Sequence, residues 1–361
     1  MKALRLVFDS VWLEELIGAL QKQQIDFDAD QFRKKVKSDI WRELALKQRI
    51  RHVSICLSEV LPTEFSEVLP VLESIAKSFF GLPHLVFSDF IELYGLDRPE
   101  KSLPVLMRLT QSSSSEFAIR PFIECDQRHT LDLMLQWTGD SNEHIRRLAS
   151  EGCRPRLPWG RALAALKKEP EPLRPILDSL RADESLYVRK SVANNLNDIS
   201  KDHPDWVLDW CTQWHGQRLE TDWIIKHGLR TLLKQGDAKA LTLIGYKNPN
   251  GVRVENWTVA SEVSLGQKIG FEATLNLEGF IGHKVRLEYA ISFVRKQKHP
   301  YRKLFKISEF VARKAVKSVR KKHDFKEIST RKYCVGKHKV ELLVNGVIMA
   351  ESEFILSECG L

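Results

Sequence analysis

Residues 142–159, which read NEHIRRLASEGCRPRLPW, bring together the side chains best able to do chemistry. Residues three and four apart share one face of a helix. One face of this segment is apolar and consists of Ile145, Leu148, Ala149 and Gly152. The opposite face is polar and consists of Arg147, Ser150, Glu151 and Arg154. The spacing therefore predicts an amphipathic helix that presents the carboxylate of Glu151 to solvent, between two guanidinium groups.

The prolines at positions 155 and 158 cannot continue this helix, so they leave Arg156 and Trp159 on a stiff segment beside the polar face. A carboxylate held among cations can stabilise a developing positive charge and orient a water molecule. The alternative is a solvated helix face whose ion pairs contribute little. The local excess of arginine, with a tryptophan just past the helix end, favours a functional face.

Two further carboxylates lie in segments on either side. Glu116 belongs to SSSEFAIRPFI, and Asp198 belongs to VRKSVANNLNDISKDHPDW. Each has a structural alternative. Glu116 could pair with Arg120 four residues later, and Asp198 could cap a helix that begins near His203. Trp159 could likewise be an anchor in the core.

Segment 142–159 resembles the signature segment of the AlkC-type bacterial alkylpurine DNA glycosylases, which belong with the AlkD-type glycosylases built from HEAT repeats. The two flanking segments resemble the corresponding parts of the same family, so the resemblance covers roughly residues 110–215. Residues 1–100 match more loosely, which leaves the outer rim of the predicted groove and the breadth of substrates open.

The resemblance implies a monofunctional glycosylase that hydrolyses the N-glycosidic bond of cationic N-alkylated bases, of the 3-methyladenine and 3-methylcytosine class. It would act with water on bent duplex DNA and start base excision repair. A cationic base is already a good leaving group, so the enzyme must chiefly stabilise positive charge on the sugar. The predicted catalytic residues are the carboxylates Glu116, Glu151 and Asp198, with Trp159 as an aromatic contact to the lesion. No cofactor is implied.

An internal repeat predicts how these residues are positioned. Aligning residues 142–147 with residues 185–190 gives a shift of 43 positions. At that shift Asp140 coincides with Asp183, Arg146 with Arg189, and Glu151 with Asn194. Two-helix units of about 40 residues are typical of HEAT-like repeats, which stack into a curved solenoid. We therefore predict that residues 1–247 form a HEAT-like glycosylase domain with the carboxylates in its groove. A helical bundle without repeats is the alternative.

Near Gly245 the segment YKNPNGVR has two turn signals and is typical of a linker. Beyond it, alternating apolar residues predict strands at 253–260, 268–277, 284–294, 326–334 and 337–344. Asn345-Gly346 between apolar runs predicts a hairpin. Residues 251–361 are therefore predicted to form a small all-β, immunoglobulin-like sandwich. The predicted fold class is mainly α, a helical solenoid followed by this sandwich.

Charge is divided unevenly between these parts. Residues 1–250 hold 35 Lys and Arg against 35 Asp and Glu, whereas residues 251–361 hold 21 against 12. Two basic segments, RKQKHPYRKLFK and RKAVKSVRKKH, are predicted to be loops that contact DNA phosphates. A sheet edge protected by lysine is the alternative. The residues predicted to bind DNA are Arg120, Arg147, Arg154, Arg156, Lys190, Arg302 and Lys303.

The remaining composition excludes several classes of protein. There is no run of about 18 apolar residues and no signal-peptide pattern. The six cysteines form no CxxC pair and the histidines form no HExxH motif, so we expect no metal site and reduced thiols in a bacterial cytoplasmic protein. Nothing demands more than a monomer. A non-catalytic binder of damaged or distorted DNA and a protein-interaction scaffold are the alternatives to an enzyme. Carboxylates that face a polyanion argue against the binder, and the basic C-terminal part argues against the scaffold.

Overall fold

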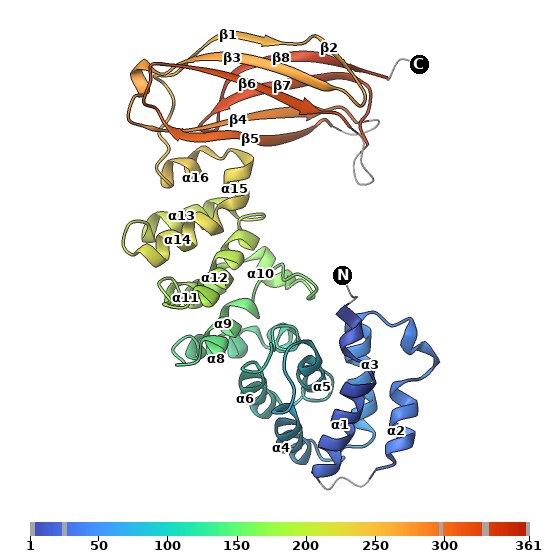
Figure 1. Ribbon diagram of the computed structural model, residues 1–361. Helices are drawn as coiled ribbons and strands as arrows, with labels where there is room; N and C mark the ends of the chain where they lie inside the picture. Colours follow the sequence, from blue (N-terminus) through green and yellow to red (C-terminus); the bar gives the residue numbers. More distant parts are fainter. Residues whose placement is uncertain (1–3, 24–26, 296–298, 327–331, 359–361) are drawn as a thin grey trace. The chain divides into compact units, whose positions relative to one another are not determined.

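The computed structural model describes four stretches of the chain, residues 4–23, 27–295, 299–326 and 332–358 (Figure 1). The chain divides into two compact units. One comprises residues 1–203 and 216–228, and the other comprises residues 204–215 and 229–361. No helix in the described part of the chain is both long enough and apolar enough to cross a membrane.

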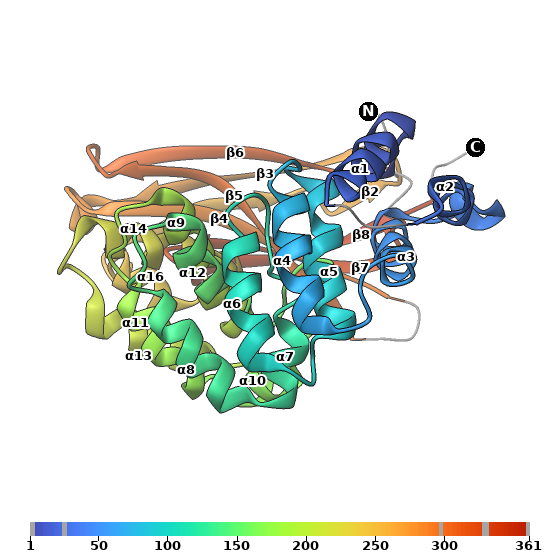
Figure 2. The same cartoon turned by 90° about the horizontal axis from the view of Figure 1, so that it is seen from below.

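The first unit is helical. Its α-helices are α1 (Ser10–Lys22), α2 (Ala29–Val36), α3 (Leu46–Ser58), α4 (Phe65–Ala76), α5 (Leu85–Tyr94), α6 (Pro99–Leu109), α7 (Arg120–Cys125), α8 (Gln127–Trp137), α9 (Glu143–Glu151), α10 (Ala164–Lys168), α11 (Arg174–Ser179), α12 (Leu186–Ile199) and α14 (Leu219–Gly228). Short 3-10 turns are η1 (Leu4–Val7), η2 (Asp39–Arg42), η3 (Leu82–His84) and η4 (Glu171–Leu173). Figures 1 and 2 show the helices stacking in succession, as α4, α6 and α9 do.

The predicted repeat is confirmed by the loops that lead into α9 and α12. Before α9, Arg146 Nη1 donates to the carbonyl oxygens of Asp140 (3.0 Å) and Ser141 (2.9 Å). Before α12, the equivalent Arg189 Nη1 donates to the carbonyl oxygens five and six residues earlier, at 2.7 and 2.8 Å. The residue before each helix accepts a hydrogen bond from the first turn, as an N-cap does. Arginines at equivalent positions therefore bind the loops that precede the equivalent helices of the two repeats.

The second unit joins three helices to a β-sandwich. Its helices are α13 (Pro204–Trp214), α15 (Arg230–Gln235) and α16 (Ala238–Leu243), with one 3-10 turn, η5 (Glu278–Phe280). Its strands are β1 (Arg253–Val259), β2 (Glu262–Ser264), β3 (Lys268–Asn276), β4 (Lys284–Phe293), β5 (Tyr301–Val311), β6 (Val316–Asp324), β7 (Gly336–Val344) and β8 (Val347–Ser357). One sheet has the order β1-β3-β6 and the other β2-β8-β7-β4-β5. The domain boundary between residues 247 and 251 stays a prediction, and β1 begins just after it.

Four of the predicted strands are confirmed, because β1, β3, β4 and β7 occupy their positions. The strand predicted at 326–334 is wrong where the structure describes it, since Lys326 and residues 332–334 lie outside any strand. Residues 327–331 of that prediction lie outside the described residues.

The two basic segments are largely strands, β5 and β6, and the prediction of loops was wrong for them. Residues 296–298 of the first segment lie outside the described residues. In β6, Val319 and His323 are buried, whereas Arg320 and Lys322 between them are exposed. Each strand lies at the edge of its sheet. This arrangement matches the lysine-protected edge.

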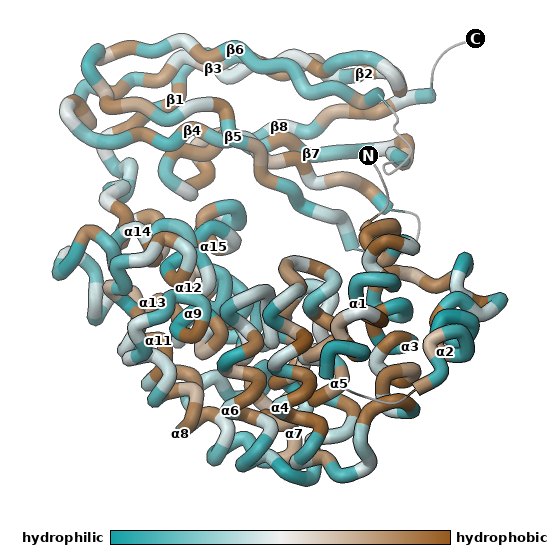
Figure 3. The backbone as a smooth tube through the Cα atoms, turned by 60° about the horizontal axis from the view of Figure 1, so that its bottom comes forward, coloured by the Kyte–Doolittle hydropathy of each residue, from teal (hydrophilic) through white to brown (hydrophobic). Residues whose placement is uncertain are grey.

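The sandwich encloses a core drawn from both sheets. Leu275, Leu287 and Val344 are buried in one part of it, and Phe271 and Phe354 in another. Figure 3 shows hydrophobic and hydrophilic residues alternating along the strands, as inward and outward positions require. The predicted hairpin is present, and its turn residues Asn345 and Gly346 have φ of 49° and 79°, which suits the tight turn of a two-residue loop. The predicted fold class is confirmed.

Candidate active site

Three carboxylates from three segments come together in the first unit. Glu116 lies in the turn before α7, Glu151 is the last residue of α9, and Asp198 lies in the last turn of α12. Arg147 joins the first two, with Nη1 2.9 Å from Glu116 Oε2 and Nη2 3.4 Å from Glu151 Oε1. Arg154 joins the last two, with Nη1 2.6 Å from Glu151 Oε1 and Nη2 2.8 Å from Asp198 Oδ2. We call these five residues the carboxylate network.

The carboxylate network is buried, which corrects the prediction that the polar face of α9 is presented to solvent. The side chains of Glu151, Arg154 and Asp198 are 6%, 7% and 3% exposed. Helix α12 packs against α9 and covers this face. A charge is tolerated in such a place only when it is paired, so each carboxylate meets a guanidinium. In a site of low dielectric these charges act on a reacting group more strongly than they would in water.

The network carries an excess of negative charge. Burial opposes the charge of both arginines, but the neighbouring carboxylates outweigh it and raise the pKa of Arg147 and of Arg154 above the usual value. Both guanidiniums therefore stay charged. When the three carboxylates are ionised, the network has one net negative charge. Lys201 offsets it from the outer end, where its Nζ lies 3.3 Å from Asp198 Oδ1 and its side chain is 40% exposed.

Three side chains that support the network were not predicted. Ser114 Oγ donates to Glu116 Oε2 at 2.9 Å. The guanidinium of Arg147 lies over the ring of Tyr187, 4.7 Å from its centroid. Lys201 follows Asp198 by three residues, a helical spacing that could have identified it. Tyr187 comes from the next repeat, and only an alignment of the repeats in space could have placed it here.

Trp159 is exposed, and the alternative that it anchors the core is wrong. Its side chain is 63% exposed, although it is large and apolar. It follows Pro158 in a turn in which the Gly160 amide donates to the Leu157 carbonyl oxygen at 3.1 Å. Its φ is 64°, in the left-handed region that favours glycine. A strained backbone that holds an aromatic ring in solvent is typical of a binding site.

Arg120 is fully buried, so its prediction as a DNA contact is wrong. Its guanidinium donates to the carbonyl oxygens of Arg161 (2.7 Å), Gly152 (2.8 Å) and Arg154 (2.9 Å). Burial lowers the pKa of Arg120 to about 10. The alternative pairing of Glu116 with Arg120 is also wrong, because the structure pairs Glu116 with Arg147. Arg120 supports the loop that leaves α9.

Three predictions remain in this unit: Arg156 and Lys190 as DNA contacts, and the alternative that Asp198 is a helix cap. Arg156 Nη2 lies 2.7 Å from Asp202 Oδ1, in a pair that is about one-third exposed. Lys190 is exposed on α12. The alternative that Asp198 caps a following helix is wrong, because it lies within α12 and binds Arg154.

This arrangement can be compared with known proteins. The sequence model of the family described as "DNA alkylation repair enzyme" matches residues 112–232, which contain the whole carboxylate network. The chain is 42% identical to the uncharacterized protein YhaZ of Bacillus subtilis over 98% of this chain and 99% of that protein. It is 38% identical to the alkylpurine DNA glycosylase AlkC of Pseudomonas fluorescens, solved bound to DNA that contains an abasic site analog. That match covers 99% of both chains with a TM-score of 0.85. The chain belongs to the AlkC family.

The second unit contains the two remaining predicted DNA contacts. The model of the family described as "Uncharacterised protein YhaZ, C-terminal Ig-like domain" matches residues 253–358, which confirms the immunoglobulin-like type of the AlkC-family sandwich. Arg302 and Lys303 lie at the start of the edge strand β5. Arg302 Nε donates to the buried carboxylate of Glu341 at 2.7 Å, and Lys303 Nζ lies 5.3 Å from the centroid of the Phe305 ring.

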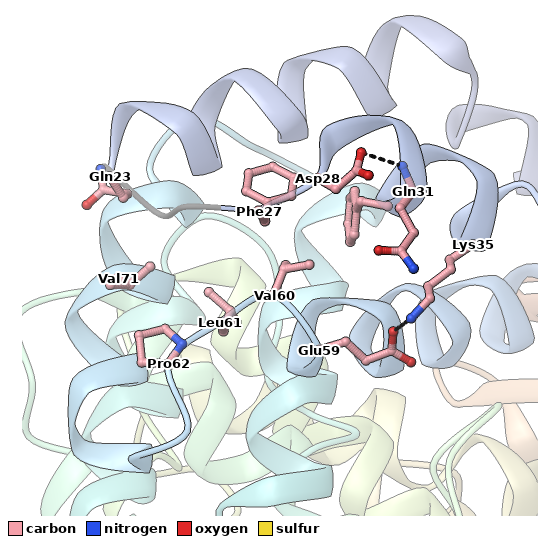
Figure 4. Close-up of a pocket in the computed structure, with 11 residues that line it drawn as sticks. Gln23, Phe27, Asp28, Gln31, Lys35, Glu59, Val60, Leu61, Pro62 and Val71 are labelled. Carbon is pink, nitrogen blue, oxygen red and sulfur yellow. Dashed lines mark hydrogen bonds and ion pairs between the residues drawn. The ribbon is translucent and has the colours of Figure 1, made fainter.

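A hollow among the N-terminal helices is separate from this site. It has a volume of about 590 Å³ and lies between α1, α2, α3 and α4 (Figure 4). Phe27, Val60 and Leu61 contribute apolar surface, and Lys35 and Glu59 form an ion pair at its side. It contains none of the residues that the sequence predicts to be functional. The candidate active site is instead the carboxylate network with Trp159.

Proposed function

We propose that the protein is a monofunctional DNA glycosylase that excises cationic N-alkylated bases, of the 3-methyladenine and 3-methylcytosine class, from bent duplex DNA and so starts base excision repair. The observation that carries the proposal is the carboxylate network, a buried cluster of three carboxylates joined by two guanidiniums, in the segment that matches the family of DNA alkylation repair enzymes. The AlkC relative of Pseudomonas fluorescens is an alkylpurine DNA glycosylase, which supports the proposal. A monomer in the bacterial cytoplasm fits this role.

The chemistry follows from the charge that develops on the sugar. When the bond from C1′ to the cationic base breaks, the base leaves as a neutral molecule and the sugar gains oxocarbenium character. A carboxylate close to C1′ stabilises that positive charge and orients a water molecule for attack. Glu151 occupies the centre of the carboxylate network, because both arginines contact its Oε1. Glu116 is more accessible, with 15% of its side chain exposed. We assign the charge stabilisation to this pair.

The arginines and Asp198 hold the pair in place. A buried guanidinium between two carboxylates fixes the rotamer of each, so Arg147 and Arg154 act on Glu116 and Glu151 more than on phosphates. Asp198 stabilises Arg154 from the far side. Trp159 supplies an aromatic face for the lesion, and cationic rings favour such a face. Arg156, Lys190, Arg302 and Lys303 remain as the proposed phosphate contacts, because each is at least partly exposed.

The test is base release from duplex DNA treated with a methylating agent, followed by chromatography of the free bases. The wild type should release 3-methyladenine and leave an abasic site. Glu151→Gln should lose release while it still binds the DNA, and Asp198→Asn should lose part of it. The competing function is a binder of damaged or distorted DNA. Salt-dependent binding by the wild type without any released base would support that binder and reject the enzyme.

A further inference from the structure

The loop that leaves α9, residues 152–161, holds Trp159 in a conformation that its own sequence does not favour. A tryptophan with φ of 64° has its Cβ close to a carbonyl oxygen, which makes this conformation unfavourable for any residue but glycine. The ring gains little from the protein in return, because it is 63% exposed. The surrounding structure must therefore fix the backbone at this residue.

The peptide group between Trp159 and Gly160 is held on both sides. Its N–H, from Gly160, donates to the Leu157 carbonyl oxygen at 3.1 Å. Its carbonyl oxygen, from Trp159, accepts a hydrogen bond from Lys47 Nζ at 2.9 Å. Rotation that relaxes φ of Trp159 would turn this peptide group and break one or both bonds. The conformation of Trp159 is thus fixed by a residue more than a hundred positions earlier in the chain.

Lys47 also contacts the segment that carries Glu116. Its Nζ lies 4.4 Å from the centroid of the Phe117 ring, which is within the range of a cation–π interaction. Phe117 is next to Glu116 in the turn before α7. Lys47 is the second residue of α3, in a helix that contributes no member of the carboxylate network. The ammonium group of Lys47 therefore contacts both the Trp159 turn and Phe117, the neighbour of Glu116.

We propose that Lys47 is a positioning residue, which holds the Trp159 turn in its strained conformation and binds it to the segment that contains Glu116 and Phe117. The inference rests on the proposed function, because it takes Trp159 to contact the lesion. The buried Arg120 also stabilises this loop, because its guanidinium donates to three of the loop's carbonyl oxygens. Lys47 is the more informative of the two for a test, because it is exposed and its loss leaves the core intact. An exposed lysine is also the usual partner of a DNA phosphate, so the test must separate positioning from phosphate binding.

The experiment compares Lys47→Met, Lys47→Arg and the matched control Lys77→Met, an exposed lysine at the end of α4. Single-turnover base release and DNA affinity at several salt concentrations are measured for each, alone and with Trp159→Ala. We expect Lys47→Met to slow release about three- to tenfold, the effect of one lost hydrogen bond. DNA affinity and its salt dependence should not change, and Lys47→Arg should recover part of the rate. In the Trp159→Ala background Lys47→Met should have no further effect, because there is no ring left to position.

Two outcomes would overturn the proposal. Equal losses in both backgrounds would show that Lys47 acts independently of Trp159. A fall in the salt dependence by about one phosphate contact would show that Lys47 binds DNA instead. A second readout does not need activity: fluorine NMR of protein labelled with 5-fluorotryptophan, with the Trp159 signal assigned by its loss in Trp159→Phe. Lys47→Met should shift or broaden that signal, and Lys77→Met should not. If the wild type releases no base, the proposed function fails, and the fluorine signal still decides whether Lys47 holds the turn.

Discussion

The repeats that begin at Asn142 and Ser185 build their helices with the same devices and end them differently. In both, an N-cap starts the helix and an arginine binds the carbonyl oxygens of the preceding loop. Helix α9 then stops at Glu151 and passes into a proline-rich loop, whereas α12 continues through Asn194, the equivalent position, to Ile199. The shared devices define the scaffold, and the site forms where the two repeats diverge.

The same comparison explains why the carboxylates meet. Because α9 ends early, its exit loop folds back and brings Arg154 to Asp198, which lies on the extra turn of α12. A strict repetition would have placed Asn194 and Glu151 in equivalent surroundings. The first unit thus gains a buried ion-pair network from one short helix beside one long helix. Changes at equivalent positions of the two repeats should therefore have unequal effects.

The largest difference should be in catalysis. Glu151→Gln keeps the shape of the side chain but removes the charge at the centre of the carboxylate network, so we expect single-turnover base release to fall by about a hundredfold or more. Asn194→Ala changes the equivalent position of the next repeat and should leave the rate within about threefold. Quenched-flow or manual quench assays on methylated DNA measure both. Similar losses in the two variants would mean that Glu151 has no special role.

The second difference should be in stability. Arg146 binds two loop carbonyl oxygens and also pairs with Asp183, with side chains only 9% and 5% exposed. Arg189 keeps the carbonyl bonds but lies over the ring of Trp223 instead of a carboxylate. Arg146→Met leaves a buried carboxylate unpaired and should cost about 3 kcal/mol of unfolding free energy.

The control for this prediction is Arg189→Met, which should cost about 1–2 kcal/mol, as expected for the loss of the carbonyl hydrogen bonds and a partly exposed cation–π contact. Urea unfolding followed by circular dichroism compares the two variants. Equal destabilisation would show that the ion pair between the repeats adds nothing to the hydrogen bonds that the repeats share.

How much of this was predictable depends on how local each interaction is. The 43-residue repeat and the Asn345-Gly346 hairpin show in residues close together in the sequence, and the sequence alone predicted them. Arg120 was misassigned because its partners are backbone carbonyl oxygens in a loop 32 to 41 positions later, and no residue type marks them. The basic segments at β5 and β6 were misassigned because their many cations hid the few residues that face the core, such as Val319 and His323 in β6.

The exit loop of α9 allows a prediction about strain. Trp159→Gly and Trp159→Ala both remove the ring, so both should slow base release by roughly tenfold, consistent with about 1–3 kcal/mol for stacking on a base. Their stabilities should differ, because only glycine adopts φ of 64° without strain. We expect Trp159→Gly to unfold at higher temperature than Trp159→Ala, by the equivalent of about 0.5–1 kcal/mol. Calorimetry checks this, and the reverse order would show that the turn is not strained.

The smallest effect concerns Arg147 and its equivalent in the next repeat, Lys190. Arg147 is held by Glu116 and Glu151, whereas Lys190 is exposed on α12. We expect Lys190→Gln to weaken binding to any duplex a few-fold at low salt and to reduce the salt slope by about one, without a change in the rate of base release. Arg147→Gln should slow base release and leave the salt slope unchanged, because Arg147 contacts the carboxylates and not the phosphates. Titrations of labelled DNA at several salt concentrations separate the two. If Arg147→Gln also reduced the salt slope, its guanidinium would have to leave the carboxylates to reach DNA, and the carboxylate network would be a feature of the free protein alone.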